Sequence, residues 1–266
     1  MNYRRKAGYP GKVPMSLPRV FLTKEQISDT AIIKGTDAHH LRNVLRLKPG
    51  DKIVICDMQR TEYECVISDI GCNGGLDIHV NITSQHVSPA EDNYETTLFQ
   101  AVVKGDRFEI AVQKSTELGI TRIVPVVTER CVARLNGDSL KSRLIRYERI
   151  AQSAAQQCGR GIIPQVASPI KYDEALQIML SDHDCPFVCY EGDGTHPLRE
   201  LIEVSPVPHK FAFLIGPEGG LSLREAKLAT EIGIPLAGLG RRILRTETAS
   251  SFVLSAISVL TCDKKM

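Results

Sequence analysis

Two loops rich in glycine, each following an apolar run, are the parts of this sequence whose residue types and spacing could support chemistry. The first loop covers residues 216–220, with the letters GPEGG, and follows the apolar run 210–215. Glycines at the end of a buried strand let a ligand approach the backbone closely, and ligands usually bind at this edge of an open parallel sheet. Taken alone, the loop fits an ordinary strand-to-helix turn about equally well, because neither the Walker A nor the G-x-G-x-x-G spacing is met.

The second loop contains Gly238 and Gly240 and continues through the cationic letters RRILR into a segment rich in small residues. A helix over 223–232 separates the two loops, and Ser222 with Glu225 forms an S-x-x-E capping box that fixes the start of this helix. Two sheet-edge loops separated by a single helix can form the walls of one pocket. The pair therefore favours a ligand site over two unrelated turns.

The elements that must position these loops follow an alternating pattern. From about residue 95 onward, short apolar runs alternate with amphipathic stretches, which is typical of a parallel sheet covered by helices on both faces. This pattern predicts an α/β fold for the C-terminal part of the chain. The predicted strands are LFQAVV, RIVPVV, PFVCYE, KFAFLIG and IPLAGLG, and the predicted helices lie around 105–118, 139–157, 172–180, 223–232 and 247–262.

The N-terminal part has a different pattern. Residues 19–87 contain short β-like runs separated by turn signals, which predicts a small barrel. One short helix interrupts these runs, and Asp37 is expected to be its N-cap. In that helix Leu41, Val44 and Leu45 are expected to share one face, which leaves Arg42 and Arg46 elsewhere for a basic rim.

Composition narrows the class of protein. The 266 residues, 42% hydrophobic and 24% charged, fit a soluble globular chain with two modest domains. No run approaches the roughly 20 apolar residues of a membrane helix, so a cytoplasmic location is expected. The eight cysteines are scattered without a C-x-x-C pair, which predicts reduced thiols and no metal site. The net charge of +2 does not require a nucleic-acid partner, although local clusters of Arg and Lys weakly favour RNA.

The motifs IGPEGG and LGRRILRTETA, in this order, resemble those of the RsmE family of 16S rRNA uridine-N3 methyltransferases, within the SPOUT superfamily of trefoil-knotted enzymes. The resemblance extends upstream through QAVVKGDRFEIAVQKSTELGITRIVPVVTER and also covers HHLRNVLRLKPGD. It implies a C-terminal SPOUT α/β trefoil-knot domain with a parallel sheet over 92–266 and a small N-terminal PUA-like β-barrel over 16–88. Residues 1–15 are expected to be a flexible tail.

The resemblance also implies that S-adenosylmethionine is the cofactor and that the methyl acceptor is N3 of a uridine in 16S rRNA. The expected partners are 16S rRNA within the small ribosomal subunit and a second copy of the chain, with no membrane and no metal. The residues expected to bind the cofactor are Leu214, Ile215, Gly216, Glu218 and Gly219 on one side, and Leu239, Gly240, Ile243, Leu244, Arg245 and Ala249 on the other.

The resemblance assigns catalysis to Arg245 and Glu247. Arg245 can stabilise negative charge on the uracil carbonyl oxygens and so ease loss of the N3 proton. Glu247 or Glu218 can accept that proton, and Thr246 and Thr248 are interpreted as N-cap and turn residues. The residues expected to contact RNA are Arg42, Arg46, Lys104, Arg107, Arg130 and Arg160.

Two alternatives stay open at this point. The chain could be a SPOUT methyltransferase acting on a different RNA, because the cofactor motifs say more about the methyl donor than about the acceptor. It could also be an RNA-binding protein without chemistry, although the intact Arg245 and the two glycine loops argue against that. A nicotinamide-dependent dehydrogenase is disfavoured because G-x-G-x-x-G is missing. The sequence leaves open the exact nucleotide and whether naked rRNA or an assembled subunit is the substrate.

Overall fold

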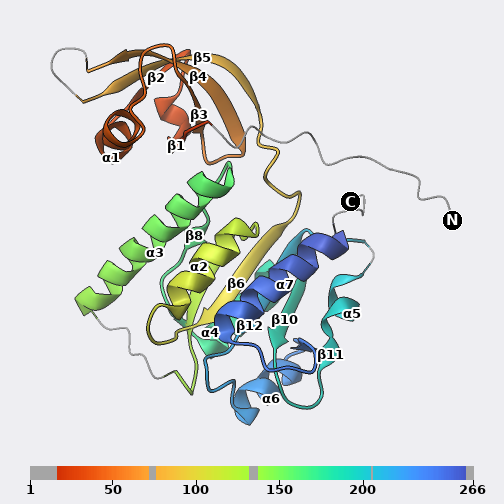
Figure 1. Ribbon diagram of the computed structural model, residues 1–266. Helices are drawn as coiled ribbons and strands as arrows, with labels where there is room; N and C mark the ends of the chain where they lie inside the picture. Colours follow the sequence, from red (N-terminus) through yellow and green to blue (C-terminus); the bar gives the residue numbers. More distant parts are fainter. Residues whose placement is uncertain (1–16, 72–75, 132–136, 205, 262–266) are drawn as a thin grey trace. The chain divides into compact units, whose positions relative to one another are not determined.

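The computed structural model describes most of the chain. The described residues are 17–71, 76–131, 137–204 and 206–261. The flexible tail expected over residues 1–15 lies outside them. Figure 1 labels the helices and strands. None of the helices in these ranges combines the length and the apolar content that crossing a bilayer requires.

The chain divides into two compact units. Unit 1 consists of the residues up to Glu91 together with 155–163, and unit 2 consists of 92–154 together with the residues from Pro164 onward. The segment 155–163 lies within the range 92–266 that the sequence analysis assigns to the C-terminal domain. Unit 1 is therefore built from two separate stretches of the chain.

Unit 1 is built around one curled sheet. Its elements are β1 (Arg19–Phe21), η1 (Lys24–Gln26), β2 (Thr30–Ile33), α1 (Gly35–His39), η2 (His40–Val44), β3 (Lys52–Cys56), β4 (Thr61–Ile70) and β5 (Ile78–Val87). The five strands lie in the order β1-β3-β4-β5-β2, with β1 parallel to β3 and the other neighbours antiparallel. Along β4 the buried side chains of Tyr63, Cys65 and Ile67 recur every second residue and pack in the core of the unit. This period of two is the pattern that predicts a strand with one buried face.

The short helix of unit 1 differs from its prediction. It begins at Gly35, with Lys34 in the N-cap position, so Asp37 lies in its first turn and is not the N-cap. It continues as a π-helical turn, and of the three expected core residues only Leu41 is buried, whereas Val44 is 59% exposed and Leu45 is 42% exposed. A π turn holds more residues than the 3.6 of an α-helix, so spacing arguments based on 3.6 fail in this segment.

The segment 155–163 is held in unit 1 by Glu91. One carboxylate oxygen of Glu91 accepts hydrogen bonds from the main-chain N–H of Gly161 at 2.9 Å and of Ile162 at 3.3 Å. The other oxygen lies 2.7 Å from Nη2 of Arg160, whose side chain is 3% exposed. Arg160 is thus enclosed in an ion pair, and its assignment as an RNA contact is corrected: its guanidinium has almost no surface to offer to a phosphate.

The remaining strands and helices belong to unit 2, except that the last residues of α3, from 155 onward, belong to unit 1. The strands of unit 2 are β6 (Glu95–Ala101), β7 (Arg122–Val127), β8 (Gln165–Val166), β9 (Ile170–Lys171), β10 (Cys185–Cys189), β11 (His196–Pro197), β12 (Lys210–Ile215) and β13 (Leu236–Gly238). The helices are α2 (Arg107–Glu117), α3 (Gly137–Cys158), α4 (Tyr172–Asp182), α5 (Leu198–Ile202), α6 (Leu223–Glu231) and α7 (Thr246–Thr261). The strands form one sheet in the order β11-β13-β10-β12-β6-β7-β8, with β9 also beside β7, and every neighbouring pair is parallel.

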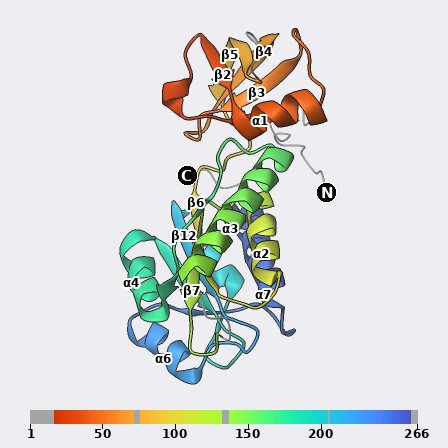
Figure 2. The ribbon, with the colours of Figure 1, turned by 90° about the vertical axis from the view of Figure 1, so that its left-hand side faces the viewer.

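Helices cover both faces of this sheet. Figure 2 shows α4 and α6 on one side and α2 and α7 on the other. On β12, Ala212 and Leu214 belong to the core cluster that contains residues of α4 and α6, while Phe211 and Phe213 alternate with them and are also fully buried. A strand that is buried on both faces reads as a continuous apolar run, which is why KFAFLI is such a clear strand signal.

Candidate active site

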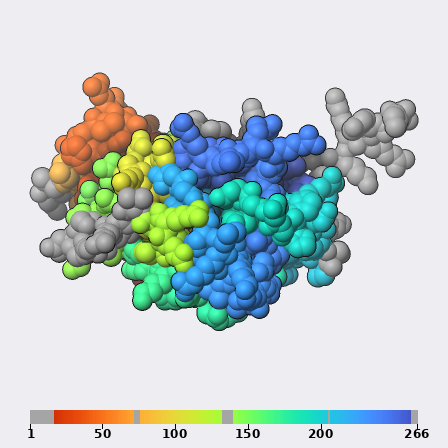
Figure 3. All heavy atoms as spheres, turned by 90° about the horizontal axis from the view of Figure 1, so that it is seen from below, coloured from red at the N-terminus to blue at the C-terminus, as the bar shows by residue number. Residues whose placement is uncertain are grey.

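A cavity of about 410 Å³ lies at the edge of the sheet in unit 2 where β10, β12 and β13 end. Because β10 lies between β13 and β12 and all of them are parallel, the three segments that follow these strands start side by side. Figure 3 looks towards this edge and shows the segment after β10 (teal) adjoining the blue segments around α6. Strand order therefore brings together loops that are far apart in the sequence.

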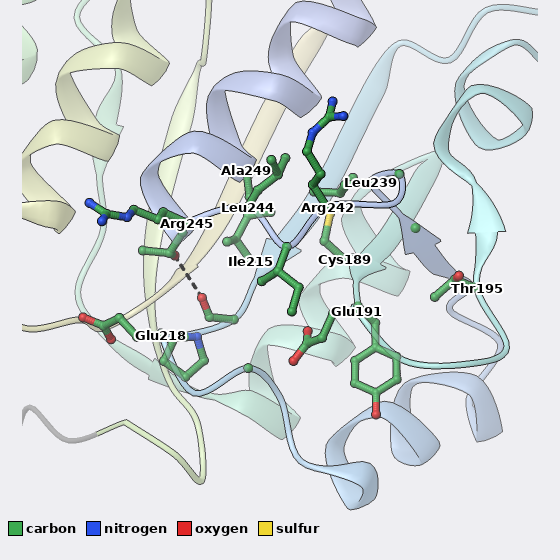
Figure 4. A pocket seen from close by; sticks show the side chains of 18 of the residues that line it. Cys189, Glu191, Thr195, Ile215, Glu218, Leu239, Arg242, Leu244, Arg245 and Ala249 are labelled. Carbon is green, nitrogen blue, oxygen red and sulfur yellow. Dashed lines mark hydrogen bonds between the residues drawn. The ribbon is translucent and has the colours of Figure 1, made fainter.

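Most of the residues expected to bind the cofactor line this cavity. They are Ile215, Gly216, Glu218, Leu239, Gly240, Ile243, Leu244, Arg245 and Ala249. Figure 4 shows Arg245 and Glu218 on one side of the cavity and Thr195 on the opposite side. Two expected residues lie differently. Leu214 is fully buried in the core against α4 and α6, and Gly219 is not among the residues that line the cavity.

The end of β10 and the segment after it supply lining residues that the sequence analysis missed. They are Cys189, Tyr190, Glu191 and Thr195. The available signal was an apolar run followed by Gly192 and Gly194, but nothing in the sequence says that this strand lies between the other two. Burial raises the pKa of the Cys189 thiol, so this side chain contributes a neutral surface to the cavity.

Glu191 packs closely against the glycine loop. A Cβ atom built on Gly220 would lie 1.8 Å from Oε1 of Glu191, and the backbone of Gly220 has a φ of +67°. The φ favours glycine at this position because L-residues rarely adopt it, and any side chain here would also displace the carboxylate of Glu191. The predicted need for glycine in the first loop thus has a specific cause at Gly220.

Two arginines expected to contact RNA also hold this loop. Arg107, the first residue of α2, places Nη1 2.9 Å from Oε1 of Glu218. Arg130, which follows β7, donates a hydrogen bond from Nη1 to the main-chain oxygen of Gly219 at 2.7 Å. The side chain of Arg107 remains 39% exposed. The loop is therefore fixed by residues from the ends of two further strands of the sheet.

The capping box at the start of α6 is confirmed. The hydroxyl of Ser222 accepts from the N–H of Glu225 at 3.1 Å, and the Glu225 carboxylate accepts from the N–H of Ser222 at 2.8 Å. The second carboxylate oxygen accepts from the N–H of Glu129 at 2.8 Å, and Glu225 is only 3% exposed. This buried carboxylate therefore joins the end of the glycine loop to the segment after β7.

Arg245 and Glu247 lie at the start of α7. The main-chain oxygen of Arg245 accepts from the N–H groups of Thr248 and Ala249 at 2.9 and 2.8 Å, so the helix begins directly after Arg245. The side chain of Arg245 is exposed and lines the cavity. Glu247 is half-buried and does not line it, and its Oε2 has no hydrogen-bond partner within the described part of the chain.

Positive charge exceeds negative charge around the cavity. The charged lining residues are Arg107, Arg241, Arg242 and Arg245 with Glu191 and Glu218. Low-dielectric walls strengthen the field inside a cleft, so this excess favours an anionic partner at the mouth. Arg42, Arg46 and Lys104 are exposed at other places, the first two in unit 1 and Lys104 after β6 in unit 2. No group of three His, Cys, Asp or Glu side chains within the described ranges is arranged to hold a metal ion.

Comparisons with known proteins define the class first. A family profile described as an RNA methyltransferase domain matches residues 90–258, and one described as the PUA domain of RNA methyltransferases matches residues 33–73. The first match covers more than half of the chain, and this chain is an RNA methyltransferase.

Individual relatives define the family within that class. The chain is 32% identical to the ribosomal RNA small subunit methyltransferase E of Bacillus subtilis, and the match covers 90% of this chain and 94% of the relative. It is 33% identical to the protein of the same name from Mesomycoplasma hyopneumoniae, and that match covers 88% of this chain and 96% of the relative. A crystal structure of the Neisseria gonorrhoeae protein of the same name, bound to S-adenosylmethionine, is 31% identical with a TM-score of 0.80, over 92% of this chain and 98% of that one. The chain belongs to the ribosomal RNA small subunit methyltransferase E family. The resemblance seen in the sequence and the predicted fold class, a parallel α/β sheet beside a PUA-like sheet, are confirmed.

Proposed function

We propose that this chain transfers the methyl group of S-adenosylmethionine to N3 of a uridine in 16S rRNA. The observation that carries the proposal is the cavity formed by the two glycine loops with Arg245 at its wall. The family supports the reaction class, and the Neisseria gonorrhoeae relative solved with S-adenosylmethionine supports the methyl donor.

The cavity has the properties of a site for this cofactor. Its volume of about 410 Å³ falls within the range of small-molecule sites. Ile215, Leu239, Leu244 and Ala249 supply apolar surface for an adenine ring, and the loop backbones supply hydrogen-bonding groups beside them. When bound, S-adenosylmethionine supplies an electrophilic methyl group. The residues above hold and orient it, and Gly216, Glu218, Gly240 and Ile243 extend the same walls.

Arg245 is proposed to activate the acceptor. N3 of uracil is protonated and neutral at physiological pH, which makes it a poor nucleophile. A guanidinium close to the uracil carbonyl oxygens stabilises the negative charge that develops as the N3 proton leaves. Glu247, whose Oε2 lacks a partner among the described residues, is proposed to take this proton. Glu218 is the alternative acceptor, although its carboxylate already pairs with Arg107.

The two predicted domains are proposed to share the RNA. We assign positioning of the rRNA to residues 16–88, through Arg42 and Arg46, and methyl transfer to residues 92–266. In unit 2, Arg107 and Arg130 hold the glycine loop, so a phosphate bound beside them would lie near the cavity. Lys104, exposed in the segment after β6, is proposed as a further phosphate contact. Contacts with phosphates fix the register of the RNA and make affinity depend on salt.

We further propose a homodimer that works in the cytoplasm on the small ribosomal subunit. On α7, Phe252 is 46% exposed and Val259 is 74% exposed, and Ile243 before the helix is 87% exposed. A second copy of the chain is the proposed cover for these side chains. In sedimentation analysis the wild type is expected to have the mass of a dimer, and Phe252→Asp is expected to shift it towards the monomer. A wild-type monomer at the concentrations used for activity would contradict the dimer.

The central test is transfer of labelled methyl groups from S-adenosylmethionine to small ribosomal subunits that lack the modification, followed by nucleoside analysis of the rRNA. Labelled 3-methyluridine is the expected product. Parallel reactions with naked 16S rRNA show which form is the substrate. Binding of the cofactor without any transfer to rRNA would mean that the site is correct and the acceptor is a different RNA.

A further inference from the structure

One fully buried polar side chain in unit 2 has no role in the reaction as described so far. Gln100 lies near the end of β6, where it pairs with Ile215 of β12 on one side and with Pro125 of β7 on the other. It is 0% exposed. Burying a polar amide costs stability unless hydrogen bonds replace those to water, so a Gln in the middle of a sheet requires a physical reason.

The amide of Gln100 begins a chain of hydrogen bonds that ends at the cofactor loop. Its Nε2 donates to Oγ1 of Thr246 at 2.7 Å and to the main-chain oxygen of Ala101 at 3.3 Å. Oγ1 of Thr246 then donates to the main-chain oxygen of Gly216 at 2.9 Å, which is the dashed line in Figure 4. Thr246 and Gly216 both line the cavity. The hydroxyl of Thr246 therefore bonds to Gly216 in the other loop of the cavity. This contact corrects the interpretation of Thr246 as the N-cap of α7.

The chemistry of these groups fixes the direction of the chain. The nitrogen of an amide only donates, so Thr246 must accept from Gln100 and its single proton is directed at Gly216. Oε1 of Gln100 has no hydrogen-bond partner in the described structure. The side chain therefore leaves its acceptor oxygen without a hydrogen bond while its donor nitrogen bonds to Thr246. Such a cost is expected where the orientation of a neighbouring group matters.

We infer that Gln100 is a positioning residue that, through Thr246, holds the first glycine loop and the start of α7 in the arrangement that accepts the cofactor. Thr246 directly follows Arg245, and Gly216 opens the GPEGG loop. The two walls of the cavity come from separate loops, and this chain of hydrogen bonds joins them inside the protein. The inference rests on the proposed function for the identity of the ligand, S-adenosylmethionine.

The test compares four single variants in the chain of hydrogen bonds, their double variant and one control variant, all of the full-length protein. Gln100→Met and Thr246→Val remove the hydrogen bonds while nearly keeping the volume, Gln100→Glu replaces the donor by an acceptor, and Thr246→Ser keeps the hydroxyl. Affinity for S-adenosylmethionine is measured by calorimetry, and kcat and KM are measured in the methyl-transfer assay. Each of Gln100→Met and Thr246→Val breaks the link between Gln100 and Gly216, and each is expected to weaken cofactor affinity about 5- to 30-fold.

The remaining variants separate positioning from general damage to the fold. Thr246→Ser is expected to bind as the wild type does, and Gln100→Glu to bind at least as weakly as Gln100→Met. The double variant Gln100→Met/Thr246→Val is expected to be no weaker than the single variants, because both act in one chain. Thr261→Val is the matched control, because Thr261 is a buried threonine at the other end of α7 whose hydroxyl donates to Ile257. It is expected to keep wild-type affinity.

Hydrogen exchange supplies a readout that needs no cofactor. In Gln100→Met, the amide of Gly220, which donates to Pro217, is expected to exchange faster than in the wild type, while amides of β6 and β12 are unchanged. Wild-type affinity and exchange in Gln100→Met, or equal losses in Thr246→Ser and Thr246→Val, would overturn the inference. A wild type that binds no S-adenosylmethionine would instead overturn the proposed function, and the exchange data would still decide the role of Gln100.

Discussion

Arg245→Ala is expected to reduce the formation of 3-methyluridine in small ribosomal subunits by about 100- to 1,000-fold, the loss typical for removal of one group that stabilises charge in a transition state. The side chain is exposed, and α7 begins with main-chain hydrogen bonds to Arg245 that alanine also provides. The fold is therefore expected to survive, and affinity for the cofactor to change much less than the rate. Single-turnover transfer with labelled cofactor, together with calorimetry, measures both quantities.

Matched variants make this result specific. Arg199→Ala removes another exposed arginine, in α5, and is expected to leave the rate unchanged. Arg245→Lys keeps the charge but not the planar guanidinium, and partial activity is expected. Glu247→Gln and Glu218→Gln compare the two proposed proton acceptors, and the larger loss of rate identifies the base. An Arg245→Ala enzyme with wild-type turnover would remove Arg245 from the mechanism.

Gly220→Ala is expected to weaken binding of S-adenosylmethionine by at least about tenfold. The added Cβ would stand 1.8 Å from Oε1 of Glu191, so this carboxylate, which lines the cavity, must move. Alanine at a φ of +67° also costs about 1–2 kcal/mol of backbone strain. Calorimetry reports the affinity, and thermal unfolding reports the strain.

Two further variants separate the collision from the strain. Gly233→Ala, in the turn after α6, has a φ of +90° and nothing within 4 Å of its new Cβ, so it carries strain alone. It is expected to lose similar stability and to keep wild-type affinity. Glu191→Ala/Gly220→Ala removes the collision and is expected to bind more tightly than Gly220→Ala. If Gly220→Ala and Gly233→Ala bind the cofactor equally well, the packing of Glu191 against Gly220 has no part in forming the site.

The sequence predicted the longer strands and helices of unit 2 because their signals are local, and it missed the short elements β8, β9, β11 and α5. A strand buried on both faces, such as KFAFLI, is a continuous apolar run, and the capping box of α6 needs only Ser222 and Glu225. The order of the strands in the sheet, in contrast, depends on segments that are far apart in the sequence. The contribution of Tyr190, Glu191 and Thr195 to the cavity follows from β10 lying between β12 and β13, which no window of sequence contains.

The remaining errors have similar causes. The π turn of η2 changes the spacing that assigned Val44 and Leu45 to a core. Arg160 looked like a surface cation because its partner, Glu91, is far from it in the sequence. Charged side chains that are buried in pairs cannot be distinguished from exposed ones by residue type alone.

The return of residues 155–163 to unit 1 has a consequence for the order of protein synthesis. The ribosome produces Glu91 well before it produces Arg160, with all of β6, α2, β7 and α3 made in between. Until that later stretch emerges, the carboxylate of Glu91 lacks the guanidinium and the two backbone donors that satisfy it, and Ala155 is missing from the cluster around Cys56. The N-terminal unit of this methyltransferase therefore reaches its final packing only after residues 92–154 of the catalytic unit have been translated.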